Sequence, residues 1–346
     1  MKSAALFEPL SVCMEEDWKI PLIGLSYVDF LTPREKNDLV NKLRSPAGIF
    51  ECSLAELSFL TKRPLRTHMW KPREILDRAE RTEKLLTPGV MGCIFYWDST
   101  YPSQLRFIFD PPLTLFFRGT LPENGLLAGI VGTRFPSGGA RKAAFGLGFE
   151  LGRQGIGVVS GLAKGVDREA HEGCVMAGGY SIAVLGSGVD IVYPPSSAGV
   201  GRALLDAGGA ILSEYPPGTA PLQFHFPARN RIICGLSHAV VVVQAPERSG
   251  ALITATYAAE EGRSVYVHSA GVAGTVGTGT RCLAEAGATV ISGAAELMQD
   301  WGLECRPAGG QAARPGETTG QALSRITKGE MEGACATKAG VTYWRT

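Results

Sequence analysis

The stretch "LLAGIVGTRFPSGGARKAAFGLGFELGRQGIGVVS", residues 126–160, decides the fold. A short apolar run (126–131) leads into a glycine-rich turn, then a segment with helical periodicity (138–154), then a second apolar run (157–160). Both runs are continuously apolar rather than alternating, which is typical of strands buried on both faces of a parallel sheet. The stretch therefore predicts a strand, a crossover helix and a second, parallel strand.

The same alternation continues to residue 291. Predicted strands cover 181–185, 210–213, 239–243, 264–268 and 289–291, and predicted helices cover about 166–178, 197–207, 228–236, 251–261 and 280–286. Upstream, "VMGCIFYW" (90–97) and "PLTLFF" (112–117) predict two further strands separated by proline-containing loops. The fold class that this pattern predicts is α/β, with a doubly wound, mostly parallel sheet.

A small helical region precedes the sheet. "TPRE" (32–35) and "SLAE" (53–56) each predict a helix start closed by a capping box, and a third helix is expected over about 72–86. Residues beyond Trp301 are rich in Gly, Ala, Thr and Arg and have no sustained period. We therefore expect three parts, which are a helical region (1–66), a sheet-containing domain (67–301) and a flexible tail (302–346).

Composition restricts the kind of site that the chain carries. The formal net charge of its 346 residues is only +1, so any anion site must be local rather than a property of the whole surface. No apolar run approaches the ~20 residues of a membrane helix, and the acidic first twenty residues do not predict a signal peptide. The eight cysteines have no zinc-type spacing. We expect a cytoplasmic protein with reduced thiols, no metal and no membrane contact.

The carboxyl ends of the predicted strands are where a doubly wound sheet binds ligands. Four loops expected at this edge combine Gly or Ser, which let an anion approach the backbone, with the cations Arg or Lys. The candidate site residues in these loops are Gly132 and Arg134; Ser160, Gly161, Lys164 and Gly165; Arg229, Asn230 and Arg231; and Ser249 and Gly250. Together they predict a phosphate-binding groove.

Recognisable catalytic and cofactor motifs are missing from these loops. A dinucleotide site would need GxGxxG after the first strand and an acidic residue after the second, and neither they nor a P-loop are present. We predict no catalytic residues and no cofactor. The spacing of Asp167 and His171 favours a hydrogen bond on a helix surface, and His225 is expected to pack. Glu214 is either a lone rim carboxylate or the anchor of a pocket arginine.

An ordered series of motifs resembles the bacterial DNA-processing protein A family (DprA, also called Smf) over roughly residues 90 to 292. The motifs are "GTR" (132–134), "SGLAKGVDREAH" (160–171), "AVLGSGVDIVYPP" (183–195), "LSEYPPG" (212–218), "HFPARNRIICGLS" (225–237) and "ERSGALITA" (247–255). The chain departs from the family at 268–281, where the family's Pro-Gly turn and longer loop are replaced, and it lacks an evident winged helix in 302–346.

This resemblance implies an extended Rossmann-like domain that binds single-stranded DNA with little sequence preference. It also implies a homodimer that protects the strand and loads the RecA recombinase in natural transformation or recombination. The family's DNA pocket maps onto Arg134, the 160–165 loop, residues 229–231, Ser249 and Gly250, nearly the set that the strand-end loops predict. Arg134, Lys164, Arg229 and Arg231 would supply the charge, and Phe135 and Phe226 either stack on bases or pack in the core.

Two alternatives stay open from the sequence. One is a nucleotide-processing enzyme of the phosphoribohydrolase type, which shares a related Rossmann-like domain. It would need a Pro-Gly-Gly-x-Gly-Thr-x-x-Glu loop, and the nearest segment, 274–285, lacks that pattern. The other is a protein-interaction scaffold on which the basic residues have no ligand.

Overall fold

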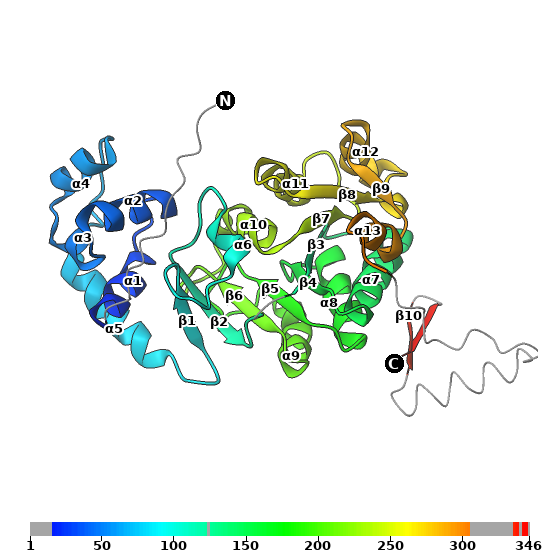
Figure 1. The fold of residues 1–346 in the computed structure, drawn as a ribbon, viewed down its shortest axis with the longest axis horizontal. Helices are drawn as coiled ribbons and strands as arrows, with labels where there is room; N and C mark the ends of the chain where they lie inside the picture. The colour runs from blue at the N-terminus through cyan, green and yellow to red at the C-terminus, as the bar shows by residue number, and fades with distance from the viewer. Residues whose placement is uncertain (1–15, 123–124, 305–334, 339–340, 345–346) are drawn as a thin grey trace, which may run out of the picture.

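The computed structural model describes residues 16–122, 125–304, 335–338 and 341–344. Its centre is a nine-stranded sheet in the order β1-β2-β6-β5-β4-β3-β7-β8-β9 (Figure 1). The strands are β1 (Gly92–Phe95), β2 (Thr114–Gly119), β3 (Leu127–Val131), β4 (Gly157–Ser160), β5 (Ser181–Val184), β6 (Ala210–Ser213), β7 (Ala239–Val242), β8 (Ser264–His268) and β9 (Thr289–Ile291). From β6 to β9 all neighbours are parallel, and β1 and β2 add an antiparallel edge.

Helices cover both faces of this sheet, as the continuous apolar runs predict. The helices of the sheet domain are α6 (Ser103–Arg106), α7 (Gly138–Arg153), α8 (Val166–Met176), α9 (Ala198–Asp206), α10 (His225–Leu236), α11 (Gly250–Glu260), α12 (Thr278–Glu285) and α13 (Ala294–Asp300). One apolar core joins α7, α8 and α13 to the sheet, and another joins α6, α10 and α11 to it. The predicted α/β class with a doubly wound, mostly parallel sheet is confirmed.

The chain reverses its direction of travel across the sheet next to β3. From β3 it winds outward through β4 and β5 to β6, and it then returns to β7, on the other side of β3, and continues to β9. This is a topological switch point, where the loops after two neighbouring strands diverge to opposite faces and leave a crevice. The carboxyl ends of β3 and β7 therefore border the crevice in which a ligand is expected.

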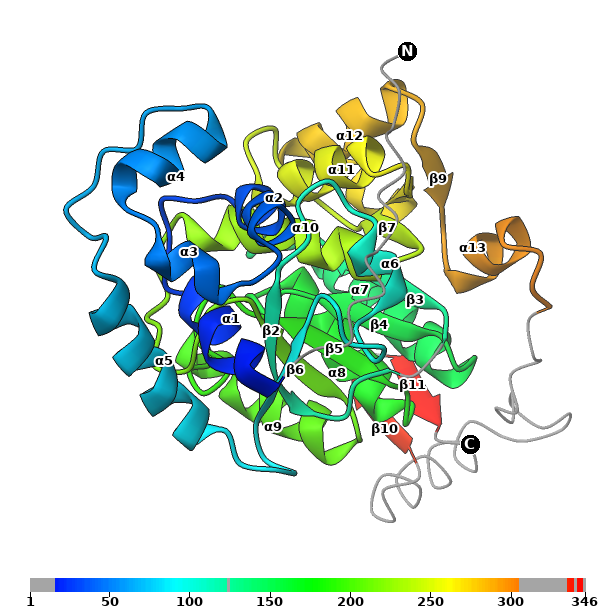
Figure 2. The same ribbon diagram turned by 60° about the vertical axis from the view of Figure 1, so that its left-hand side comes forward.

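The helical N-terminal layer consists of α1 (Lys19–Leu25), α2 (Pro33–Leu43), α3 (Ala47–Glu51), α4 (Leu54–Thr61) and α5 (Pro72–Leu85) (Figure 2). Both predicted capping boxes are confirmed, at Thr32 for α2 and at Ser53 for α4. α5, which lies beyond the predicted boundary at residue 66, packs against α1, and the Lys19 ammonium pairs with the Glu83 carboxylate at 2.7 Å. Its apolar core is continuous with that of the β1–β2 edge.

Most of the predicted tail (302–346) lies outside the described residues. Within it the structure places two short strands, β10 (Cys335–Lys338) and β11 (Val341–Trp344), which pair antiparallel with each other. None of the helices in the described ranges combines the length and the apolar character that crossing a bilayer requires.

Candidate nucleic-acid interface

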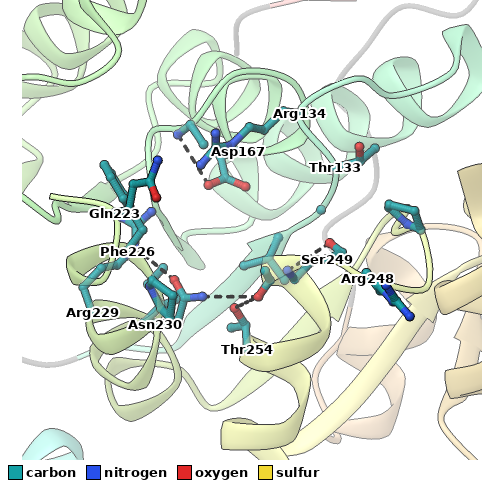
Figure 3. Close-up of a pocket in the computed structure, with 18 of the residues that line it drawn as sticks. Thr133, Arg134, Asp167, Gln223, Phe226, Arg229, Asn230, Arg248, Ser249 and Thr254 are labelled. Atoms are coloured by element: carbon teal, nitrogen blue, oxygen red, sulfur yellow. Dashed lines mark hydrogen bonds between the residues drawn. The ribbon is translucent and has the colours of Figure 1, made fainter. Parts of the chain in front are cut away.

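A pocket of about 560 Å³ opens at the topological switch point, between the loops that follow β3 and β7 and the first turns of α10 and α11 (Figure 3). Six of the predicted site residues line it, and these are Gly132, Arg134, Arg229, Asn230, Ser249 and Gly250. The lining holds three arginines (Arg134, Arg229 and Arg248) and one carboxylate (Asp167). The local excess of positive charge that the sequence predicts is therefore present at this edge of the sheet.

The loop after β3 is held in place by the end of β7. The Thr133 backbone N–H donates to the Gln244 carbonyl oxygen at 2.7 Å, and the Ser137 N–H donates to the Gln244 side-chain oxygen at 2.8 Å. Ser137 in turn caps α7. With both ends of the loop fixed, Arg134 and Phe135 extend into solvent at the pocket mouth, and 80% of the Phe135 surface is exposed.

The loop after β7 leads directly into α11. The Ser249 hydroxyl caps this helix by accepting the Ala251 N–H at 3.1 Å, and Arg248 beside it is exposed. The segment 268–281, whose contact with ligand the sequence leaves open, supports this loop from behind. Thr280 Oγ1 accepts the Ala245 N–H at 2.7 Å and Thr278 Oγ1 accepts the Glu247 N–H at 3.1 Å. No residue of 268–281 is among those lining the pocket.

Arg229 is a buried cation in the wall of the pocket. Its guanidinium donates to the Gly161 carbonyl at 3.0 Å, to the Val184 carbonyl, and to the Asn230 side-chain oxygen at 3.0 Å. In the described part of the chain no carboxylate oxygen lies within 4.0 Å of it. Burial lowers the pKa of Arg229 to about 10, so it keeps its charge at neutral pH. Neutral oxygens hold the charge in place, and the Asp167 carboxylate, beyond 4.0 Å, favours the charged form of Arg229.

Asp167, the pocket carboxylate, is used in local structure. It accepts the backbone N–H groups of Gly161 at 3.2 Å and Ala163 at 3.4 Å. Burial raises its pKa, and Arg229 opposes that rise. The predicted hydrogen bond between Asp167 and His171 on a helix surface is wrong, because both residues are buried and His171 Nδ1 instead lies 2.8 Å from the Ser181 hydroxyl.

The loop after β4 supports the pocket and contributes one residue, Ala163, to its lining. Ser160 Oγ donates to the Ile130 carbonyl, and the Gly161 carbonyl accepts from Arg229. Gly165 has φ +80°, and a Cβ there would lie 2.4 Å from the Thr133 carbonyl oxygen, so it lets the loops after β3 and β4 approach closely. Lys164 is exposed beside the pocket. Ser160, Gly161 and Gly165 therefore shape the site, Lys164 is exposed next to the lining residue Ala163, and none of these four predicted residues lines the pocket.

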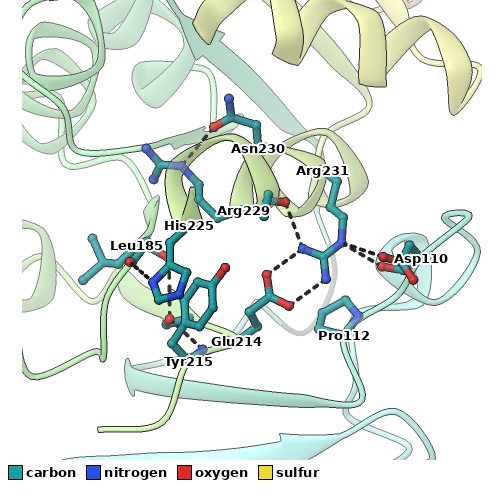
Figure 4. Close-up of polar contacts among 12 residues, drawn as sticks. Asp110, Pro112, Leu185, Glu214, Tyr215, His225, Arg229, Asn230 and Arg231 are labelled. Carbon is teal, nitrogen blue, oxygen red and sulfur yellow. Dashed lines mark hydrogen bonds and ion pairs between the residues drawn. The ribbon is translucent and has the colours of Figure 1, made fainter. Parts of the chain in front are cut away.

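Arg231, the remaining predicted site residue, does not line the pocket. Its side chain leaves α10 on the side away from Arg229, because residues two apart on an α-helix project about 200° apart. Its guanidinium forms a bidentate ion pair with Glu214 at 2.6 and 2.7 Å, and its Nε lies 3.7 Å from the Asp110 carboxylate (Figure 4). Arg231 is thus neutralised outside the pocket. Glu214 anchors an arginine, as one of its two predicted roles requires, but not an arginine of the pocket.

Several pocket residues were not in the predicted set. Arg248, Tyr193 and Gln223 also line the pocket, as do Phe135 and Phe226, the aromatics considered above for stacking. The Tyr193 and Phe226 rings lie 5.7 Å apart, centre to centre. Arg248 directly precedes the predicted Ser249 in a loop that combines Arg with Ser and Gly, as the loop of Arg134 does, so the sequence could have indicated it. Tyr193 comes from the long loop after β5, and no local pattern marks it.

His225 packs, as predicted. Its ring stacks on that of Tyr215 with 3.7 Å between centres, and its Nδ1 lies 3.0 Å from the Gly186 carbonyl oxygen. Burial lowers its pKa, although the Gly186 carbonyl and Glu214 oppose the effect. His225 therefore fixes the start of α10 against the loop after β5.

Comparison with known proteins gives consistent matches over the sheet domain. A family model described as DNA recombination-mediator protein A matches residues 92–302. Protein Smf of Synechocystis is 42% identical over 195 residues, which cover 55% of this chain and 47% of that protein. DNA processing protein DprA of Bacillus subtilis is 39% identical over 202 residues, which cover 58% of this chain and 68% of that protein.

Two solved structures resemble this one. DNA processing protein A of Streptococcus pneumoniae superimposes with a TM-score of 0.67 and 29% identity, covering 83% of this chain and 99% of that one. DNA processing protein A of Helicobacter pylori, reported for its unique single-stranded DNA binding mode, superimposes with a TM-score of 0.54 and 27% identity. That match covers 61% of this chain and 95% of the other.

Proposed function

Because the chain belongs to the DNA recombination-mediator protein A family, we propose that its switch-point pocket binds the backbone of single-stranded DNA, largely independently of sequence. In this proposal the protein protects single-stranded DNA and makes it available for recombination. It acts by binding rather than by catalysis, and the only carboxylate in the pocket lining is already engaged by two backbone N–H groups.

The observation that carries the proposal is a set of unneutralised cations on one pocket. Arg134 and Arg248 are exposed at its mouth, and neither has an ion-pair partner within 4.0 Å among the described residues. Arg229 adds a third charge from within the wall. Guanidinium groups match the geometry of phosphate oxygens, and contacts to phosphate alone carry no base identity. The expected binding is therefore tolerant of sequence.

Aromatic rings at the pocket mouth favour a single strand over a duplex. Phe135 is largely exposed, and Tyr193 and Phe226 form a pair across the pocket wall. Stacking of an unpaired base on such a ring contributes about 1–3 kcal/mol, and duplex DNA does not present its base faces. We propose that these rings give single strands their advantage.

The proposal extends to partners through the family likeness. We propose that the protein works as a homodimer and that it hands the strand to the RecA recombinase during natural transformation or related recombination. Two pockets on one strand would raise the apparent affinity through effective concentration without new contacts. Because the matched region spans about half of the Synechocystis relative, these partners are proposed and not carried over from that protein.

Alanine variants of the exposed arginines test the proposal. The double variant Arg134→Ala, Arg248→Ala should bind a labelled poly-dT oligonucleotide at least a hundred-fold more weakly in fluorescence anisotropy, as two charge-assisted contacts of about 1.5–3 kcal/mol each are lost. Arg202→Ala, which removes an exposed arginine of α9 outside the pocket, is the control and should bind like wild type. Equal binding by all three proteins would favour the scaffold alternative.

A further inference from the structure

All three guanidinium nitrogens of Arg231 donate hydrogen bonds to other groups of the protein. Nε donates to the Asp110 carbonyl at 2.9 Å, Nη1 donates to Glu214 at 2.6 Å and to the Ala228 carbonyl at 2.9 Å, and Nη2 donates to the second Glu214 oxygen at 2.7 Å. Only 8% of the side chain is exposed. With four of its five N–H donors used within the protein and its charge paired, Arg231 has little to offer a phosphate.

These contacts fix the segment that carries the pocket's buried cation. Arg231 lies two residues from Arg229 and one from Asn230, within the first two turns of α10. Glu214 follows the end of β6 and Asp110 lies in the loop before β2. The contacts of Arg231 with these two residues, here called the clamp, therefore tie α10 to two separate parts of the sheet domain (Figure 4). A shift or rotation of α10 would move Arg229 off the Gly161 and Val184 carbonyls that orient it.

The clamp also reaches the helical N-terminal layer. The Asp110 carboxylate accepts the Arg34 backbone N–H at 2.8 Å, in the first turn of α2, while its other oxygen faces Arg231. This contact suits a carboxylate, because the first turn of a helix exposes N–H groups and carries partial positive charge. Burial lowers the pKa of Lys36, on the same helix, to about 8, with Glu214, Arg231 and Asp110 as charged neighbours. The N-terminal layer thus shares one cluster of charges with α10.

We propose that Arg231 is a positioning residue for the DNA site: its clamp to Glu214 and Asp110 sets Arg229 and Asn230 in the pocket and makes DNA affinity depend on the N-terminal helical layer. Arg231 itself contacts no phosphate. The inference rests on the proposed function, since it concerns the same pocket. It assigns the two arginines of the Arg-Asn-Arg segment to different tasks, one in the pocket wall and one behind it.

The test uses the full chain, labelled poly-dT and a series of salt concentrations. Glu214→Gln and Asp110→Asn weaken the clamp, Arg231→Gln removes its charge, and Arg231→Lys keeps the charge but loses the bidentate geometry. All four should raise the dissociation constant by about two- to thirty-fold, the effect typical of residues that influence a site without touching its ligand. Glu83→Gln, which breaks the Lys19 ion pair away from α10, is the matched control and should bind like wild type.

The salt dependence separates positioning from contact. For Arg231→Gln, the slope of log affinity against log salt should equal that of wild type, whereas loss of a direct contact would reduce it by about 0.7. Arg231→Lys should be impaired, although a phosphate contact would largely tolerate this substitution.

Three results would overturn the inference. They are a reduced slope for Arg231→Gln, full affinity for Arg231→Lys, or full affinity for Glu214→Gln and Asp110→Asn. Circular dichroism monitors folding, and if Arg231→Gln does not fold, Asp110→Asn, at a partly exposed side chain, and the isosteric Glu214→Gln decide the question. Failure of wild type to bind poly-dT would overturn the proposed function as well, so the two failures are distinguishable.

Discussion

Gly161 shows how a single missing side chain shapes this site. A Cβ built on it would lie 2.2 Å from Arg229 Nη2 and 2.5 Å from the guanidinium carbon, closer than any real contact. The same residue accepts a hydrogen bond from Arg229 through its carbonyl oxygen and donates its N–H to Asp167. The absence of a side chain at Gly161 therefore lets a buried cation rest against the backbone.

Substituting Gly161 by alanine should displace Arg229 without removing any charge from the sequence. We expect the Gly161→Ala variant to bind poly-dT about ten-fold more weakly, equivalent to about 1.4 kcal/mol, because the guanidinium leaves its carbonyl partners. Anisotropy titrations at fixed salt measure the effect. Gly199→Ala is the control, since a Cβ at this helical position meets nothing within 4 Å. Wild-type affinity in Gly161→Ala would show that the position of Arg229 does not matter for binding.

At the scale of elements, α10 is held from two opposite sides. On one side Arg229 and Asn230 connect it to the loop after β4 and to the start of α11. On the other side Arg231 ties it to Glu214 and Asp110. Breaking a buried ion pair by removing one partner typically costs about 3–5 kcal/mol, because the remaining charge is left unpaired. The helix is consequently sensitive to the ionisation state of Glu214.

The stability of the fold should therefore depend on pH through Glu214. Burial acts to raise the pKa of this carboxyl, but the Arg231 guanidinium outweighs burial and holds it below its usual value. The unfolded chain thus takes up the proton first, near pH 4.3, and the stabilisation is lost as pH falls from there through the lower folded-state pKa.

A matched variant isolates this effect. We expect Glu214→Gln to be less stable than wild type by about 3 kcal/mol at pH 7. The difference in free energy of unfolding should shrink progressively below about pH 4.3, the unfolded-state value for a glutamate. Urea unfolding of both proteins from pH 7 to pH 3 measures it. A difference that stays constant across this range would mean that Glu214 does not contribute through its charge.

The course of the main chain was largely predictable from the sequence, and the pairing of side chains was not. Strands such as β4 and β8 have the predicted bounds, because continuous apolar runs between glycine-rich turns are local signals. α10 begins at His225 rather than near residue 228, since His225 stacks on Tyr215 and its Nδ1 lies 3.0 Å from the Gly186 carbonyl oxygen in the loop after β5. Local patterns fix elements to within a few residues.

Arg231 shows that local sequence patterns do not predict which side chains pair in the folded protein. Its partner Glu214 lies 17 residues earlier and Asp110 lies 121 residues earlier, so only the folded sheet brings the three together. Helical geometry predicts that the side chains of Arg229 and Arg231 point in different directions. It does not predict that Arg231 pairs with carboxylates. The docking of α5 on α1 likewise depends on contacts distant in sequence.

At the scale of the whole molecule, a chain of formal charge +1 gathers three arginines at one crevice of its sheet. Such a molecule has no long-range field to attract nucleic acid, so binding must arise from short-range contacts at the pocket. The place of these contacts follows from topology, since the loops after β3 and β7 separate only at the switch point. The topological switch point, the three arginines and the pocket therefore lie at the same edge of the sheet.

A salt titration of binding to single-stranded poly-dT and to a duplex of equal length tests this account most directly. If Arg134, Arg229 and Arg248 each neutralise one phosphate, the slope of log affinity against log salt for the single strand should be about −2, from about 0.7 per phosphate. The single strand should bind more tightly than the duplex at every salt concentration. A slope near zero, or equal affinity for the two DNAs, would contradict the assignment of this pocket to the backbone of single-stranded DNA.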